Sequence, residues 1–139
     1  MSLRFVDTNI LLRYLVRDDE NRGKQALALL RRVEQGKEKV ATSSMVVFET
    51  VFTLEKRYRF PREQIKQAML DILSLRGLEL PNKGLYETVF DLYVGHNISF
   101  ADAFNAAYMA SREMVEIYSW DADFDKLPGV TRVEPEEAR

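Results

Sequence analysis

Short, mostly apolar segments alternate with longer segments that have helical spacing of apolar residues. The short segments are typical of buried strands, because each is brief and ends abruptly. We expect strands at Leu3–Val6, Lys39–Thr42, Leu78–Leu80 and Val115–Ser119, with a further edge strand at Thr131–Val133. Strands that alternate with helices form a parallel sheet covered by helices on both faces. The pattern therefore predicts an α/β fold.

The segments between the strands carry start and stop signals of helices. Ser43 or Ser44 and Ser99 are favoured N-cap residues, Pro61 suits a first helical turn, and Gly36 suits a helix end. The predicted helices run from Asp7 to Tyr14 or Val16, 22–35, 43–58, from Pro61 to about Leu75, 85–94, 99–111 and 121–127. In the helix after Pro61, the buried face is predicted to hold Ile65, Met69, Ile72 and Leu73. We expect the charged tail 134–139 to be loose.

Four acidic residues lie where the chain is otherwise apolar: Asp7, Glu49, Asp102 and Asp121. Asp7 and Asp121 each follow a predicted strand directly. Glu49 and Asp102 lie in the first two turns of helices that would start at the same edge of the sheet. Sites in open α/β sheets lie beyond the carboxyl ends of the strands. The topology therefore predicts that the four carboxylates meet there, withdrawn from solvent.

Carboxylates that share a cavity repel one another and are costly to desolvate, unless a cation lies between them. Ligation by oxygen alone suits Mg²⁺ or Mn²⁺, and Mg²⁺ commonly shares its shell with substrate phosphates. The chemistry that this predicts is hydrolysis of a phosphoryl ester with one or two metal ions.

Each acidic residue also has a simpler structural explanation. Asp7 and Asp121 could be helix N-caps, and Asp102 could complete a capping box with Ser99. Capping does not exclude metal ligation. Glu49 is harder to explain in this way, because most residues around it are apolar, including Met45 and Val46 one helical turn before it and Phe52 one turn after it.

Composition narrows the class of protein. The chain has 139 residues, which predicts a single domain over 1–139. The absence of cysteine excludes disulfides, thiolate zinc sites and cysteine nucleophiles. With no apolar run long enough for a membrane span and no signal peptide at the N-terminus, we expect a cytoplasmic protein. His96 is the only histidine, which excludes a nuclease that uses a pair of histidines, and no glycine-rich phosphate loop is present.

The net charge of −2 would not by itself attract nucleic acid. The basic residues are nevertheless bunched, which is typical of solvated helix faces or of a footprint for a phosphate backbone. The bunches are Arg13/Arg17, Arg31/Arg32, Lys37/Lys39 and Lys56/Arg57/Arg59/Arg62.

Four segments together carry a family resemblance: FVDTNILLRYL, SSMVVFETVFTLEKRY, ISFADAFNAAYMA and IYSWDADFDKLPGV. In this order and at this length, the chain resembles PIN-domain proteins and looks most like the VapC group of toxin ribonucleases. The resemblance covers essentially the whole chain. It implies a three-layer α/β/α sandwich with a central parallel sheet, an acidic pocket that binds Mg²⁺ or Mn²⁺, and cleavage of single-stranded or loop regions of RNA.

The resemblance also implies roles for individual residues. The acidic quartet of the family falls on Asp7, Glu49, Asp102 and Asp121. Supporting positions fall on Asn9 near the first acid, on Ser119 where the family usually has threonine, and on Asp123. We expect Asp125 to be a solvated helix charge. Family members typically form homodimers and are silenced by an antitoxin protein. The stretch Phe52–Phe60 and the helix after Pro61 could supply such a surface, or could pack internally.

Three other functions remain open from the sequence. The same catalytic fold could process RNA without an antitoxin, and a small neighbouring gene with a DNA-binding start would separate the two. A binding module could keep the fold without the activity, although an intact quartet argues against it. A receiver-type phosphoacceptor domain would need an adjacent acidic pair near the first strand, which the single Asp7 does not provide.

Overall fold

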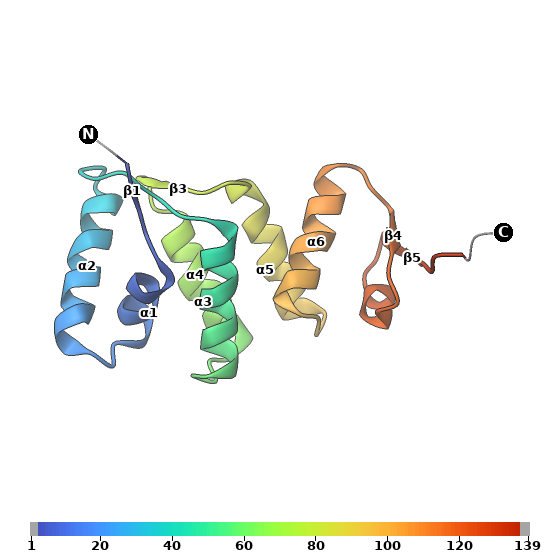
Figure 1. Cartoon of the computed structure of the whole chain (residues 1–139), viewed down its shortest axis with the longest axis horizontal. Coiled ribbons are helices and arrows are strands. Elements are labelled where there is room, and N and C mark those ends of the chain that lie inside the picture. Colours follow the sequence, from blue (N-terminus) through green and yellow to red (C-terminus); the bar gives the residue numbers. More distant parts are fainter. Residues whose placement is uncertain (1–2, 137–139) are drawn as a thin grey trace. The chain divides into compact units, whose positions relative to one another are not determined.

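The chain forms two units in the computed structural model, which describes residues 3–136 (Figure 1). The first unit spans Met1–Lys83 and the second spans Gly84–Arg139. Of the tail that we expected to be loose, residues 137–139 lie outside the described part. No helix within residues 3–136 has the length and apolar character needed to cross a membrane.

A three-stranded parallel sheet organises the first unit. Strands β1 (Arg4–Phe5), β2 (Val40–Ala41) and β3 (Leu78–Glu79) lie in this order, and Val40 is in register with Arg4 on one side and Leu78 on the other. Two helices follow each of the first two strands. They are α1 (Thr8–Val16) and α2 (Glu20–Glu34) after β1, and α3 (Ser44–Lys56) and α4 (Arg62–Leu73) after β2.

Aliphatic side chains fill the core of the first unit. Val33, Val47 and Leu54 are fully buried. The buried residues of α4 are the four that helical spacing predicts. The apolar face of this helix therefore packs internally, as the second of our two interpretations expected. In the preceding stretch, by contrast, Phe52 remains 64% exposed.

Aromatic side chains join the two helices of the second unit. Helices α5 (Tyr86–Gly95) and α6 (Phe100–Ser111) follow a short 3₁₀ turn, η1 (Lys83–Leu85). The Phe100 ring lies 5.0 Å from the Phe90 ring and 5.5 Å from the Tyr93 ring, centroid to centroid. These separations favour tilted and edge-to-face contacts, which add to the stabilisation from burial alone.

A two-stranded parallel sheet completes the second unit. Strand β4 (Glu116–Tyr118) pairs with β5 (Thr131–Val133), and the 3₁₀ helix η2 (Ala122–Lys126) lies between them along the chain. The predicted α/β class with parallel strands is thus confirmed, since all observed pairings are parallel. Strands β1 to β4 are shorter than the sequence predicted, and β5 has the predicted bounds. The single domain over 1–139 stays a prediction.

Candidate metal centre

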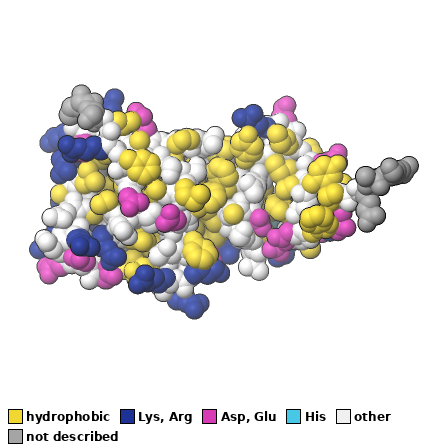
Figure 2. Space-filling model, viewed as in Figure 1, with side chains coloured by type: hydrophobic (Ala, Val, Ile, Leu, Met, Phe, Trp, Pro, Cys, Tyr) yellow, Lys and Arg dark blue, Asp and Glu magenta, His cyan; other side chains and the backbone are white. Residues whose placement is uncertain are grey.

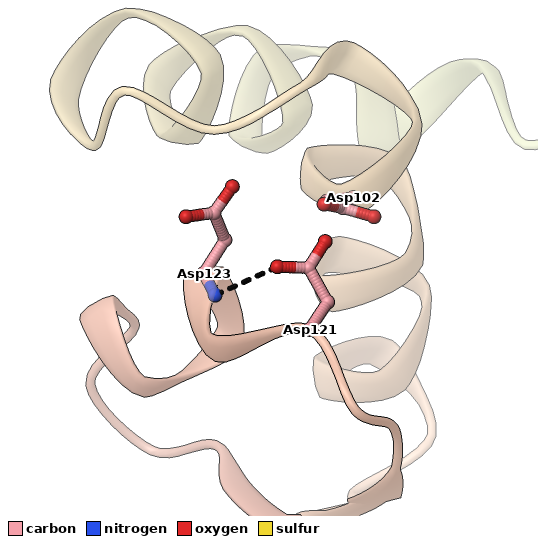
Figure 3. A group of neighbouring side chains, drawn as sticks. All are labelled: Asp102, Asp121 and Asp123. Carbon is pink, nitrogen blue, oxygen red and sulfur yellow. Dashed lines mark hydrogen bonds between the residues drawn. The ribbon is translucent and has the colours of Figure 1, made fainter.

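Three aspartates gather in the second unit (Figure 3). Asp102 comes from the first turn of α6, Asp121 is the N-cap residue of η2, and Asp123 lies within η2. Each offers one carboxylate oxygen, and these oxygens all lie within 4.8 Å of one another. We call Asp102, Asp121 and Asp123 the aspartate cluster.

Two serines fix the backbone on either side of the aspartate cluster. The Ser99 hydroxyl caps α6 by accepting a hydrogen bond from the Asp102 backbone N–H at 3.1 Å. The Ser119 hydroxyl accepts one from the Asp121 N–H at 3.0 Å. Ser119, to which the resemblance gives a supporting position, thus holds the backbone that presents the Asp121 carboxylate.

Capping accounts for part of this arrangement. One Asp121 oxygen accepts a hydrogen bond from the Asp123 N–H at 2.9 Å, so Asp121 does cap η2 (Figure 3). Ser99 likewise caps α6, as the capping-box interpretation expected. A carboxylate has about four lone-pair sites, so a single capping bond leaves Asp121 able to bind a cation.

The electrostatics of the aspartate cluster favour a bound cation. Partial burial raises the pKa of Asp102 above its ordinary value, the nearby charge of Asp121 raises it further, and a hydrogen bond with Ser99 opposes the shift. On the other side, the Lys126 ammonium group lies 2.9 Å from Asp123. One lysine offsets only part of three negative charges. An oxygen-only donor set of this kind fits Mg²⁺ or Mn²⁺.

Asp7 and Glu49 lie in the first unit, and both side chains are exposed there. Asp7 is the N-cap residue of α1 but makes no capping hydrogen bond through its side chain, so capping does not explain its carboxylate. Glu49 shares the exposed face of α3 with Met45 and Phe52, which are 67% and 64% exposed. The expectation that the four carboxylates are withdrawn from solvent is wrong for Asp7, Glu49 and Asp121, which are exposed. At Glu49 the apolar neighbours on the same helix face are exposed as well.

A family assignment follows from comparison with known proteins. Residues 4–130 match the PIN domain family, a stretch that includes most of both units. The chain belongs to the PIN domain family.

Two individual proteins are similar to this PIN-domain chain. A VapC ribonuclease of Aquifex aeolicus is 25% identical over 135 residues, which cover 97% of this chain and 98% of that protein. The crystal structure of Mycobacterium tuberculosis VapC20, a Sarcin-Ricin loop cleaving toxin, is 26% identical to this chain. The alignment covers 94% of this chain and 98% of that one, with a TM-score of 0.38.

Two further residues of this PIN domain contribute directly to the aspartate cluster or its charge balance. Asp123, expected to be a supporting residue, contributes an oxygen to the aspartate cluster itself. Lys126 was not singled out, although its position three residues after Asp123 is a spacing at which helical side chains meet. Asp125 behaves as expected, since it is exposed and pairs with Arg132.

In the first unit, the first two residues of α1 are polar. Asn9 is exposed and lines a groove of about 610 Å³ together with Arg4 and Arg13. Thr8 is buried, and its hydroxyl has no hydrogen-bond partner in the part of the chain that the structure describes. The apolar run that follows Asp7 gives no sequence signal for such a buried hydroxyl.

Proposed function

We propose that this PIN-domain protein is a metal-dependent endoribonuclease that hydrolyses RNA phosphodiester bonds. The aspartate cluster carries the proposal, because it brings three carboxylate oxygens within 4.8 Å of one another in a chain of this family. The similarity to a VapC ribonuclease along nearly the whole chain supports RNA as the substrate.

The residues of the aspartate cluster would hold Mg²⁺ or Mn²⁺. When bound, such a cation supplies Lewis-acid stabilisation of negative charge on phosphoryl oxygens. Ser99 and Ser119 keep Asp102 and Asp121 in place through their backbone N–H groups. Because the pKa of Asp102 is raised, protons compete with the cation at this carboxylate, and we expect metal affinity to fall as the pH is lowered.

Asp7 and Glu49 are proposed to take part in the same reaction. Their assignment rests on the family motifs in which they lie. The absence of a side-chain capping bond at Asp7 is consistent with this role, because the carboxylate is left available for a ligand.

We further propose that the protein is the toxin of a VapBC-type toxin–antitoxin pair, acts as a homodimer, and works in the cytoplasm. The similarity to VapC ribonuclease supports the first statement. A small neighbouring gene whose product co-purifies with this chain and suppresses its activity would support the pair. If the chain cleaves RNA but has no such neighbour, a role in general RNA processing is favoured.

The nuclease is tested by mapping RNA 5′ ends in cells that express the parent chain or Asp102→Asn. We expect new 5′ ends with the parent chain and none with Asp102→Asn. Loss of the charge at one cation ligand should lower the cleavage rate roughly 100-fold or more, since such metal contacts contribute several kcal/mol to the transition state. Asp7→Asn and Glu49→Gln should have the same effect if their assignment holds.

Asp125→Asn is the matched control. It makes the same chemical change in η2, but at a carboxylate that faces Arg132 instead of the aspartate cluster. Cleavage by this variant should match that of the parent chain. Equal patterns of 5′ ends from the parent and from Asp102→Asn would contradict the proposed site, and no new ends from the parent would contradict the proposed function.

A further inference from the structure

Four cations and two tyrosines lie at the C-terminal ends of α1 and α3, in the first unit. The cations Arg17, Lys56, Arg57 and Arg59 are exposed, and the tyrosines are half-buried. We call this set, with Tyr14 and Tyr58, the basic patch. Figure 2 shows dark blue side chains gathered below the lower end of α3.

Helix α1 packs against α3, and individual residues connect the turns that follow the two helices. Arg13 of α1 forms an ion pair with Asp18, which raises the pKa of Arg13. Tyr58, which follows α3, lies close enough to Arg13 to raise this pKa by a smaller amount. Asp18 in turn lies within reach of the charge of Arg57. The turn after α1 and the turn after α3 therefore form one surface.

Most of the positive charge on this surface is not neutralised. Lys56 pairs with Glu55 at 3.0 Å. Among residues 3–136, none of the ion pairs involves Arg17, Arg57 or Arg59. Arg17 donates one hydrogen bond from its Nε to the Tyr14 carbonyl oxygen, at 3.1 Å. All three arginines are exposed and can still offer N–H donors to an anion.

Two of the arginines lie over aromatic rings. The Arg17 guanidinium carbon is 5.5 Å from the centre of the Tyr14 ring, and that of Arg57 is 5.6 Å from the Tyr58 ring. A guanidinium group that stacks on a ring is held in one orientation and still presents N–H donors at its edge. Surfaces that bind single-stranded nucleic acid combine such cations with aromatic side chains.

The backbone adds an independent observation. Arg17 and Arg59 have left-handed conformations, with φ of 58° and 59°. Glycine adopts this conformation at lower cost than any other residue. Arginine therefore occupies two positions at which glycine would cost less backbone energy, and both of these positions lie in the basic patch.

We propose that the basic patch binds the phosphate backbone of the single-stranded RNA on which the protein acts, an inference that rests on the proposed nuclease function. Helix α1 connects Asp7 at its start to Arg17 at its end, about 15 Å along its axis at 1.5 Å per residue. The basic patch is thus an RNA contact at the opposite end of this helix from Asp7.

The test measures binding of a fluorescent oligouridylate in the Asp102→Asn background with chelator present, so that neither cleavage nor metal contributes. The variant Arg17→Gly/Arg59→Gly removes two charges and relieves both left-handed arginines. We expect affinity to fall roughly tenfold and the slope of log affinity against log salt to fall by about 1.4, or about 0.7 for each lost phosphate contact. Because glycine suits both positions, thermal stability should be unchanged or higher.

Lys37→Ala/Lys39→Ala is the matched control, since it removes the same charge from the first unit at the turn before β2. Affinity should change less than about twofold, because salt screens charges that do not touch the RNA. Equal losses in the two variants, or an unchanged affinity in the glycine variant, would overturn the proposal. Binding of polyglutamate, a model of an acidic protein, is measured in the same way. If Arg17→Gly/Arg59→Gly weakens binding of polyglutamate but not of RNA, the proposal is overturned in favour of an acidic protein partner.

Cleavage by chains with intact Asp102 separates this inference from the proposed function. If the parent chain cleaves RNA and Arg17→Gly/Arg59→Gly cleaves it more slowly at low substrate but equally at saturation, the basic patch binds substrate. If the parent chain does not cleave RNA, the nuclease function fails, and the difference in oligouridylate binding still decides whether the basic patch binds RNA.

Discussion

The two units of the chain carry opposite charge. Residues 1–83 contain 16 Lys and Arg against 11 Asp and Glu, a net charge of +5. Residues 84–139 contain 4 against 11, a net charge of −7. The value of −2 for the whole chain therefore describes neither unit. This division places the three carboxylates of the aspartate cluster and the arginines of the basic patch on different units, whereas Asp7 and Glu49 lie on the basic one.

The units also differ in the side chains that hold them together. The first has an aliphatic core beneath a three-stranded sheet, and the second has an aromatic cluster between two helices. A two-stranded sheet is marginal without packing from helices, so α5 and α6 are the main source of stability in the second unit.

The largest expected effect comes from one core substitution in each unit. Leu54→Ala should lower the free energy of unfolding by about 2–5 kcal/mol and Phe90→Ala by about 3–5 kcal/mol, because both side chains are fully buried. Urea unfolding followed by circular dichroism and by Trp120 fluorescence would measure both. Trp120 lies in the second unit.

The same experiment tests the single domain predicted over 1–139. If the chain unfolds as one domain, both signals should shift together for each variant. A Leu54→Ala chain in which circular dichroism shifts but Trp120 fluorescence does not would contradict the prediction, and would show that the two units unfold independently.

Periodicity and capping signals predicted most of the secondary structure. The buried face of α4 and the serine caps of α3 and α6 were predicted correctly, because these features depend on residues a few positions apart. The left-handed Arg17 and Arg59 were not predicted. Their conformation is set by the chain reversals that follow α1 and α3, and arginine carries no local signal for it.

The candidate site was predicted less completely. Asp102 and Asp121 were expected to meet, and their carboxylates do lie in one cluster. The full role of Asp123 was missed, because it depends on the tight η2 turn that the capping bond of Asp121 creates. The apolar neighbours of Glu49 suggested burial, but apolar composition does not distinguish a buried helix face from an exposed one that holds Met45 and Phe52.

Metal binding should stabilise the second unit. At a Mg²⁺ or Mn²⁺ concentration 100-fold above the dissociation constant, we expect about 2.7 kcal/mol of added stability and a corresponding rise in Tm. Asp102→Asn should remove most of this rise, while Glu49→Gln in the first unit shows whether the effect extends beyond the aspartate cluster. A Tm that does not respond to either ion would contradict a metal site at the cluster.

Ser119 offers a smaller and more specific test. Its hydroxyl accepts a hydrogen bond from the Asp121 N–H, so Ser119→Ala should let the Asp121 carboxylate move and should slow cleavage about tenfold. Ser119→Thr keeps the hydroxyl and should restore the parent rate and the parent affinity for metal, measured by calorimetry. If Ser119→Ala and Ser119→Thr are equally active, Ser119 does not position the site.

The smallest expected effect is a dependence of stability on pH in the second unit. Without metal, the pKa of Asp102 is raised above 3.8 in the folded chain, mainly by burial and then by Asp121. Between 3.8 and the raised value, the folded chain binds more protons than the unfolded chain, so the free energy of unfolding falls as the pH rises. Asp102→Asn lacks this contribution.

The Tm of the parent chain relative to that of Asp102→Asn should therefore decline as the pH rises through this window, in the presence of chelator. Saturating Mg²⁺ should oppose the decline, because the cation favours the ionised carboxylate. A relative Tm that instead increases with pH would mean that the folded chain stabilises the charged form of Asp102. The carboxylate would then serve mainly to cap α6 with Ser99, and the case for a cation at the cluster would lose its electrostatic basis.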